Sequence, residues 1–487
     1  MGGDEPPADG EPPSDSTTQP KALQEQLVNV ADHGDIILSV TFITSDATLR
    51  RTRKAALASR KPSNSNNHDP APAMTPRLTI SYRVTLSALK HHSKYFANLL
   101  TNPSFREAQL IAAVHAHLAS RNIKPGEAEA PDLPRILITD DDDATQCAGR
   151  EHAFEDMLRL VHQKSIKTTR VTMSYVTTLA IIADRFDCTA AVSRALADMK
   201  FKWPLTSTKP YMDDSGRVTE VEKVLRQKVL VAWLLSQPMR LHQSSKELLM
   251  RGSRLWGQPY GYEEGHLCAA WWNLPEGIEE ELQHRRECIL NTISSIQSHF
   301  LALYSSRDRQ CKLGYDSSAA CDSFQFGQML KFLLSKDLLF LVDFSPASVD
   351  RLPDISLLDV DELLSTLKQC PNYQVDKHHL NCGLRIRIDP ILDYVKAMVS
   401  ASVVSIPHAD WTRRRADVSW VSSTQADTTY RGNRGDDVND NDDDKRVFAF
   451  TRALANDQRL RYEGAIYADR MAKSLFTADG WNWTPEL

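Results

Sequence analysis

The amino-acid sequence predicts an α+β protein in which an N-terminal αβ region is followed by a mainly α-helical region. Apolar and polar residues alternate from Asp35 to Val40 and again from Leu78 to Val84, which is the pattern of half-buried strands. The segment from Leu86 to Phe96 instead has apolar residues at helical spacing. From about Thr219 to Ser402 the apolar residues repeat mainly with the helical period. These observations predict a small sheet with helices near the start of the chain and helices after it.

The N-terminal region, residues 21–203, is expected to combine strands with several helices. The strands are predicted at residues 35–42, 77–84 and 135–140, and the helices at residues 21–30, 87–100, 151–163, 173–186 and 189–199. Two polar segments interrupt this pattern as insertions, at about residues 45–76 and 109–133. The first lacks a periodic apolar pattern, so we expect it to form a loop or to be disordered; the second is expected to be part helix and part loop.

The helical region is predicted to span residues 217–402 and to be followed by a tail, residues 403–487. Its helices are expected near residues 221–234, 239–250, 278–304, 323–334, 360–367 and 390–399. In the tail, the acidic segment 436–444 is expected to be a linker, with short helices at residues 447–454 and 462–475. Trp481 and Trp483 indicate that their segment docks on the rest, because exposed tryptophans are unfavourable. Residues 1–20 have almost nothing to bury and are expected to be disordered.

The composition of the 487 residues argues against some classes of function. The formal net charge of −5 argues against a general nucleic-acid binder, which would carry a basic face. No apolar run is long enough to cross a bilayer, so we expect no contact with a membrane. Eight scattered cysteines and a polar start without a secretory pattern indicate reduced thiols in the nucleus or cytoplasm. The basic run Arg50–Lys54 fits either a nuclear import signal or, more commonly, a solvated charged segment.

From about Val30 to Trp203 the sequence resembles a BTB/POZ domain, a module for protein–protein interaction. The resemblance lies in the order strand–strand–helix–strand–helices and in a set of residues at family positions, which are Asp35, Leu89, Ser93, Phe96, Phe105, Glu107, Ala183 and Asp184. The sequence departs from the family at Thr85 and Leu86, where His and a basic residue often line a charged pocket near the aspartate. A BTB/POZ domain followed by a long helical region is the plan of BTB proteins in filamentous fungi.

The resemblance implies a non-enzymatic role in which the BTB-like domain forms a homodimer or binds a protein partner. One alternative is a substrate adaptor of a cullin-type ubiquitin ligase, because Phe105 and Glu107 match the hydrophobic-x-Glu motif with which such adaptors contact the cullin. The competing interpretation of that pair is a core phenylalanine beside a solvated glutamate. Another alternative is a nuclear regulator of transcription or chromatin. Because phosphate-binding, dinucleotide-binding, hydrolase and metalloprotease motifs are absent from the sequence, we expect no catalytic site and no small-molecule substrate.

One group of residues has the chemistry of a metal site. Cys311 and Cys321 precede a His-x-x-Cys pair, His379 and Cys382, so that three thiolates and one imidazole are available for one ion. Such a set would form a closed structural zinc site without an open position for catalysis. Free cysteines are also among the most often buried residues, and ordinary buried thiols are the commoner explanation. Both interpretations stay open, and no other cofactor is expected.

Overall fold

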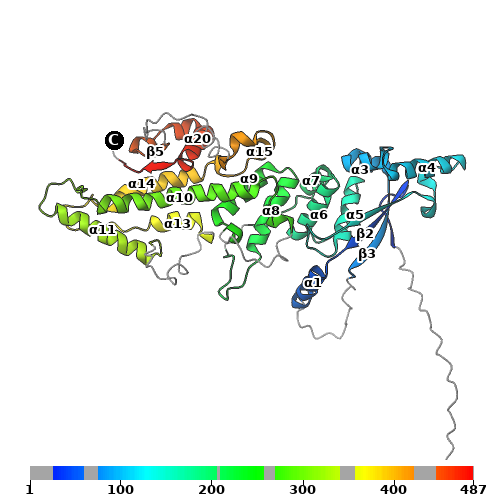
Figure 1. Ribbon diagram of the computed structural model, residues 1–487, viewed down its shortest axis with the longest axis horizontal. Coiled ribbons are helices and arrows are strands. Elements are labelled where there is room, and N and C mark those ends of the chain that lie inside the picture. Colours follow the sequence, from blue (N-terminus) through cyan, green and yellow to red (C-terminus); the bar gives the residue numbers. More distant parts are fainter. Residues whose placement is uncertain are drawn as a thin grey trace, which may run out of the picture.

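The computed structural model describes residues 26–59, 75–205, 209–256, 269–339, 357–421 and 446–485. Figure 1 shows an elongated molecule in which a small sheet with its helices lies at one end and a long array of helices extends away from it. The disorder predicted for residues 1–20 and the linker predicted at residues 436–444 lie outside the described residues. The combination of a small sheet with many helices confirms the predicted α+β class.

A four-stranded sheet with the order β1–β3–β2–β4 organises the N-terminal region. β2 (Ile36–Ile43) pairs antiparallel with β3 (Arg77–Val84) and parallel with β4 (Arg135–Asp140). β1 (Gln26–Asn29) pairs parallel with β3. The first residues of β2 are buried without alternation, whereas β4 at the sheet edge alternates between exposed and buried positions. The central strand is therefore covered on both faces.

The segment predicted as one helix after β3 consists of two helices, α2 (Leu86–His92) and α3 (Lys94–Thr101). Ser93 separates them because its backbone is extended and its hydroxyl caps α3 by accepting the N–H of Phe96, 2.9 Å away. The same hydroxyl donates to the carbonyl of Phe186 at 2.7 Å. The break in the helix thus ties the pair to a segment that is distant in the sequence.

Further helices complete the N-terminal region, namely α4 (Arg106–Ser120), α5 (Arg150–Val161), α6 (Met173–Arg185) and α7 (Thr189–Asp198). Its core contains a group of aromatic rings around Phe154 of α5. The centroid of the Phe154 ring lies 5.7 Å from that of Phe42, 5.4 Å from that of Tyr82 and 5.3 Å from that of Phe186. All of these side chains are buried, so strands and helices share one apolar core.

Two segments near the start of the chain differ from the prediction. Residues 26–29 form strand β1 instead of part of a helix, because pairing with β3 outweighs the helical spacing of a few apolar residues. The polar segment after β2 is predicted as a loop, but α1 (Asp46–Ser59) is a helix. Ser45 starts it by accepting the N–H of Thr48, and the carboxylate of Asp142 accepts the N–H and hydroxyl of Ser45. A serine followed by an acidic residue is a helix start signal, and here it outweighs the missing apolar period.

The helical region contains long helices joined by irregular segments and short helices. They are α8 (Val221–Leu234), α9 (Pro238–Arg251), α10 (Ile278–Ser305), α11 (Ser318–Ser335), α13 (Val360–Leu367), α14 (Leu384–Val399), α15 (His408–Arg413), α16 (Arg415–Val418), α18 (Arg452–Ala455), α19 (Arg459–Tyr462) and α20 (Gly464–Phe476). α11 and α14 begin earlier than predicted. The apolar core of this region meets that of the N-terminal region where α6 packs against α8. No helix among the described residues is long and apolar enough to span a membrane.

The tail predicted to begin at residue 403 is not separate from the helical core. The side chains of Trp411 and Trp420 are buried in the same apolar cluster as α10. Trp483 is buried there as well, and its Nε1–H donates to the hydroxyl of Ser295 on α10 at 2.8 Å. The docking predicted from the tryptophans is therefore present, and it joins the tail to the helical region.

A second, two-stranded sheet replaces the beginning of one predicted tail helix. β5 (Val447–Ala449) pairs parallel with β6 (Gly480–Asn482), although residues 447–454 are predicted as helical. The N–H of Phe450 continues the pairing by donating to the carbonyl of Asn482 at 2.8 Å. The local apolar spacing could not reveal the partner strand, because β6 follows α20 in the sequence.

Candidate functional site

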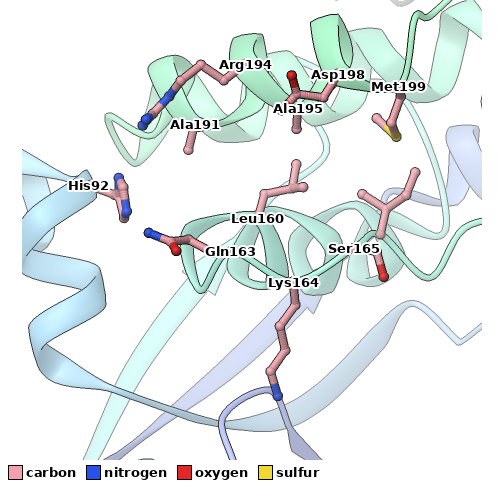
Figure 2. A pocket seen from close by; sticks show the side chains of 11 residues that line it. His92, Leu160, Gln163, Lys164, Ser165, Ala191, Arg194, Ala195, Asp198 and Met199 are labelled. Atoms are coloured by element: carbon pink, nitrogen blue, oxygen red, sulfur yellow. The ribbon is translucent and has the colours of Figure 1, made fainter.

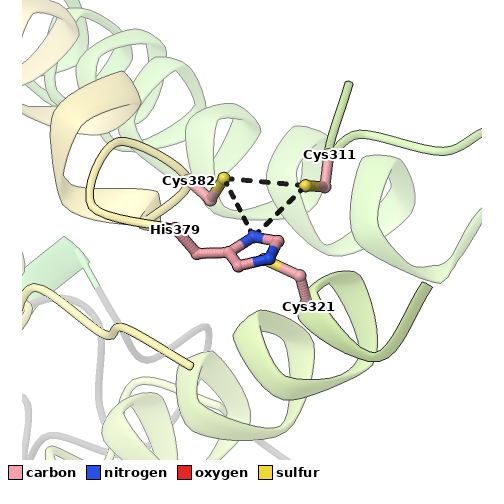
Figure 3. Close-up of side chains that lie close together, drawn as sticks. All are labelled: Cys311, Cys321, His379 and Cys382. Atoms are coloured by element: carbon pink, nitrogen blue, oxygen red, sulfur yellow. Dashed lines mark hydrogen bonds between the residues drawn. The ribbon is translucent and has the colours of Figure 1, made fainter. Parts of the chain in front are cut away.

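The structure brings together the residues predicted as metal ligands, Cys311, Cys321, His379 and Cys382 (Figure 3). Cys311 lies between α10 and α11, Cys321 lies on α11, and the other two lie just before α14. The ligand atoms of these residues, here called the Cys/His cluster, all lie within 4.8 Å of one another. In the described part of the chain, this is the only group of His, Cys, Asp or Glu side chains with spacing suited to a metal ion.

The distances within the Cys/His cluster are short and similar. Sγ of Cys311 lies 3.4 Å from Nδ1 of His379 and 3.7 Å from Sγ of Cys382, and the last two atoms lie 3.5 Å apart. The sulfurs are not disulfide-bonded, since an S–S bond measures about 2.0 Å. Cys311, Cys321 and His379 are buried, while Cys382 is half-buried. Two free thiols thus lie beside Nδ1 of His379, and the third, that of Cys321, lies within 4.8 Å of the other ligand atoms.

Local backbone hydrogen bonds hold two parts of the cluster in place, namely the loop that carries Cys311 and the turn that carries His379 and Cys382. The carboxylate of Asp322 accepts the N–H of Gln310 at 2.8 Å and that of Cys311 at 3.0 Å, which fixes the loop before α11 against the first turns of that helix. The N–H of Cys382 donates to the carbonyl of His379 at 3.3 Å. The His-x-x-Cys spacing therefore forms a turn, and both of its side chains reach the same point.

The second ring nitrogen of His379 has partners of its own. Nε2 lies 3.0 Å from the hydroxyl of Ser317 and 3.8 Å from a carboxylate oxygen of Asp376. These contacts orient the ring so that Nδ1 faces the sulfur atoms of Cys311 and Cys382, as Figure 3 shows. Nothing in the sequence singles out Ser317, because its contact joins residues 62 positions apart.

The thiols of the Cys/His cluster influence one another's protonation. Burial raises the pKa of Cys321 to about 12, and the neighbouring Cys382 and Cys311 add to this effect. Burial also raises the pKa of Cys382. Burial acts in the same direction on Cys311, but hydrogen bonds to neighbouring groups, including Cys382 and Cys321, outweigh it and lower its pKa. One thiolate is thus favoured over three, since adjacent negative charges repel one another unless a cation lies between them.

A surface cavity of about 350 Å³ borders the Cys/His cluster. Cys311 and Cys382 line it together with polar side chains that include Gln310, Asp322 and Arg387. Two of the sulfur-bearing residues therefore face a path from solvent, while Cys321 and His379 lie behind them. The cavity gives a small ion access to the cluster.

The residues predicted to contact a partner, Phe105 and Glu107, lie at the start of α4. Phe105 is 37 % exposed, so the interpretation of this residue as part of the core is wrong. Glu107 is half-buried and lies near Tyr95, which is 41 % exposed. Burial raises the pKa of Tyr95, and the carboxylate of Glu107 adds to that increase. An apolar ring and a carboxylate are thus presented together at the surface of the N-terminal region.

A second hollow, of about 390 Å³, lies between α5 and α7 (Figure 2). Leu160 forms part of its apolar lining, and His92, Lys164, Arg194 and Asp198 are among its polar residues. Figure 2 shows that the side chains of Lys164 and Arg194 extend in different directions. Burial lowers the pKa of His92, with smaller contributions from His91 and Arg194. His92, Gln163 and Arg194 lie together at one end of the hollow, whereas Lys164 points away from them.

Comparisons of the chain with protein-family models, with curated proteins and with solved structures found no match. The fold and the site therefore define a class only in structural terms: an α+β protein with a buried Cys/His cluster in its helical region.

Proposed function

We propose that the chain is a non-enzymatic protein-interaction protein of the nucleus or cytoplasm, whose N-terminal region is a BTB/POZ-like domain that dimerises or binds a protein partner. The order of the elements carries this proposal. β2 and β3, the α2–α3 pair, β4 and then α5 to α7 follow the strand–strand–helix–strand–helices order on which the resemblance rests. In this proposal the helical region supports the domain or recruits a second protein.

The surroundings of Asp35 support a contact surface that differs from the charged pocket of the family. Oδ1 of Asp35 accepts the N–H of Leu86 at 2.7 Å, at the first residue of α2. The N–H of Thr85 donates to Nε2 of His162 at 2.9 Å. The carboxylate is thus engaged with backbone, and no basic side chain stands at these two positions. In this proposal the contact surface is therefore made of exposed apolar residues rather than of a charged pocket.

The molar mass of the full chain in solution, measured by light scattering over a wide range of concentrations, tests dimerisation. We expect the mass to rise towards twice the 54.8 kDa of one chain as the concentration increases. Proximity labelling in cells tests for a separate protein partner. A chain that remains monomeric at every concentration and labels no protein above a matched control would contradict the proposal.

A cullin adaptor is the second candidate function, because the exposure of Phe105 leaves its ring available to a partner. We expect the full chain to bind a purified cullin scaffold, and Phe105→Ala combined with Glu107→Ala to weaken binding by at least about tenfold. Leu137→Ala is the matched control, since Leu137 is an apolar residue 77 % exposed on β4 and is not part of the Phe105–Glu107 motif. No binding by the unmodified chain, or equal losses in the two variants, would rule out this function.

A further inference from the structure

We propose that Cys311, Cys321, His379 and Cys382 bind one Zn²⁺ ion in a closed, structural site. This inference does not depend on the proposed interaction function, because the site lies in the helical region and acts on the fold of that region. Three thiolates and one imidazole form a donor set that is typical of structural zinc. The spacing of the donor atoms, their surroundings and the contacts of the histidine each support this assignment.

The spacing of three of the donor atoms matches one face of a tetrahedron around a zinc ion. With Zn–S bonds of about 2.3 Å, Zn–N bonds of about 2.0 Å and tetrahedral angles, two sulfurs lie about 3.8 Å apart and a sulfur lies about 3.5 Å from the nitrogen. The corresponding distances are 3.7 Å between Cys311 and Cys382, and 3.4 and 3.5 Å from these sulfurs to Nδ1 of His379. Cys311, Cys382 and His379 therefore already have the mutual spacing that a shared ion imposes, and the sulfur of Cys321 lies within 4.8 Å of their ligand atoms.

The surroundings of these thiols differ from those of ordinary buried cysteines. Cys188 and Cys370 are buried within the apolar cores, which is the usual environment of a free cysteine. The thiols of the Cys/His cluster instead face one another and a fully buried imidazole. Sulfur is a weak hydrogen-bond partner, so thiols alone compensate poorly for the burial of His379. A metal ion satisfies the sulfurs and the nitrogen together.

The environment of His379 is that of a metal ligand. Its Nε2 contacts Ser317 and Asp376, and this leaves Nδ1 as the nitrogen directed at the sulfurs. Metal-binding histidines usually have such a partner on the second nitrogen, which fixes the orientation of the ring. The cavity beside Cys311 and Cys382 gives the ion a path to these ligands.

The donor set also selects among metals. Magnesium and calcium prefer oxygen ligands, and the Cys/His cluster has none. Thiolates and imidazole suit zinc, but copper(I) and iron also bind thiolates, so the metal has to be identified directly. With four protein ligands, zinc would keep no position for a water molecule, and the site would serve the fold rather than catalysis. It would join the start of α11 to the segment before α14, linking Cys311 to a residue 71 positions later.

Elemental analysis of the purified full chain tests the site directly. We expect about one zinc per chain, released by a chelator in the presence of a zinc-responsive dye, and a lower melting temperature after removal. Cobalt(II) loaded in place of zinc should give the visible absorption bands of a four-coordinate, thiolate-rich site. These measurements need no variant, so they remain decisive even where a substitution prevents folding.

Substitutions then assign the ligands. Cys382→Ser is the preferred variant because Cys382 is half-buried, and we expect it to reduce the zinc content to less than about one tenth. Cys370→Ala is the matched control, since Cys370 is a buried cysteine of the same region outside the Cys/His cluster, and it should keep its zinc. The proposal is overturned if the unmodified chain takes up no zinc after reconstitution, if it holds iron or copper instead, or if Cys382→Ser keeps its zinc.

Discussion

The two regions of the molecule differ in how many arginine side chains they bury. Among the described residues, the N-terminal region buries one arginine, Arg150, whereas the helical region buries three, Arg226, Arg285 and Arg286. Arg150 lies beside the sheet and donates to the carboxylate of Asp140 at 2.8 Å. The rest of the N-terminal core is largely a packing of apolar and aromatic side chains. Buried arginine, though not buried charge as a whole, is therefore more frequent in the region that has little sheet.

Arg285 on α10 shows what the buried charges do. Its guanidinium donates to the carboxylate of Glu281 at 2.7 Å. It also donates to the backbone carbonyls of Val403, Ser405 and Val418, at 2.8, 2.7 and 2.9 Å. Val403 and Val418 lie in short helices after α14 and Ser405 lies between them, and each buried carbonyl there still needs a donor. Arg150 acts in the same way in the N-terminal region, where it donates to the carbonyls of Ile43, Asp140 and Cys147. The comparison teaches that the regions differ in how many buried arginines hold their backbone carbonyls, and not in what each arginine does.

The largest expected losses of stability come from removing Arg285 from the helical region and Phe154 from the N-terminal region. Arg285→Ala leaves the carboxylate of Glu281 buried without its cation, and we expect the free energy of unfolding to fall by about 3–5 kcal/mol. Phe154→Ala removes a buried ring and is expected to lower it by about 3–5 kcal/mol. Hydrogen exchange locates each loss: in residues 403–418 for the first variant and in the sheet for the second. If both variants lose protection in the same places, the regions are not independent and the comparison fails.

A smaller effect is expected from the charge of Glu281. Burial raises its pKa, but Arg285, the N–H of Trp420 and the hydroxyl of Ser419 outweigh burial and lower it. A carboxyl with a lower pKa in the folded state stabilises the fold above its unfolded pKa, and this contribution is lost as the pH falls through the folded pKa. Glu281→Gln should lower stability at neutral pH by about 1.5–3 kcal/mol and reduce its decline in acid.

Thermal melting of both chains from neutral to acidic pH measures this difference. Parallel pH profiles for the unmodified chain and Glu281→Gln would show that the carboxylate does not carry the acid sensitivity.

The smallest effect is expected from an exposed ion pair in the same region. Arg385 and Asp389 lie 3.2 Å apart on α14, with side chains 49 % and 37 % exposed. Water and salt screen such a pair, so Arg385→Ala should change stability by less than about 1 kcal/mol. Denaturant unfolding of Arg385→Ala and Arg285→Ala compares the loss of an exposed arginine with that of a buried one. Both variants remove the same charge, so a difference in stability reports on burial. A loss in Arg385→Ala as large as that in Arg285→Ala would show that burial is not the deciding factor.

The sequence was sufficient to predict elements whose apolar pattern is local. It was not sufficient where pairing with a distant segment determines the secondary structure. Residues 77–84 alternate clearly, and β3 has those bounds; residues 360–367 have helical spacing, and α13 has those bounds. β1 and β5 are strands because of their pairing with β3 and β6. The helix break at Ser93 likewise depends on a carbonyl 93 positions away. Local propensity cannot encode such contacts.

For the candidate site, sequence reasoning supplied the residue types but not their convergence. The His-x-x-Cys spacing places His379 and Cys382 on one turn, which is a local property. The approach of Cys311 and Cys321 to that turn depends on how α10, α11 and α14 pack, and no short motif records this packing. Ser317 could be recognised only after the ring of His379 had been placed.

The buried position of Trp483 has a consequence for the order of events during protein synthesis. Its contact with Ser295 spans 188 positions, so the core around α10 is completed only when that tryptophan has been made. The residues of the N-terminal core extend no further than Leu235, and that region can fold much earlier. At ordinary rates of about 5–20 residues per second, the part of α10 that Trp483 covers waits about ten seconds or longer for that residue. The helical region is therefore the part of the nascent chain whose core is completed last.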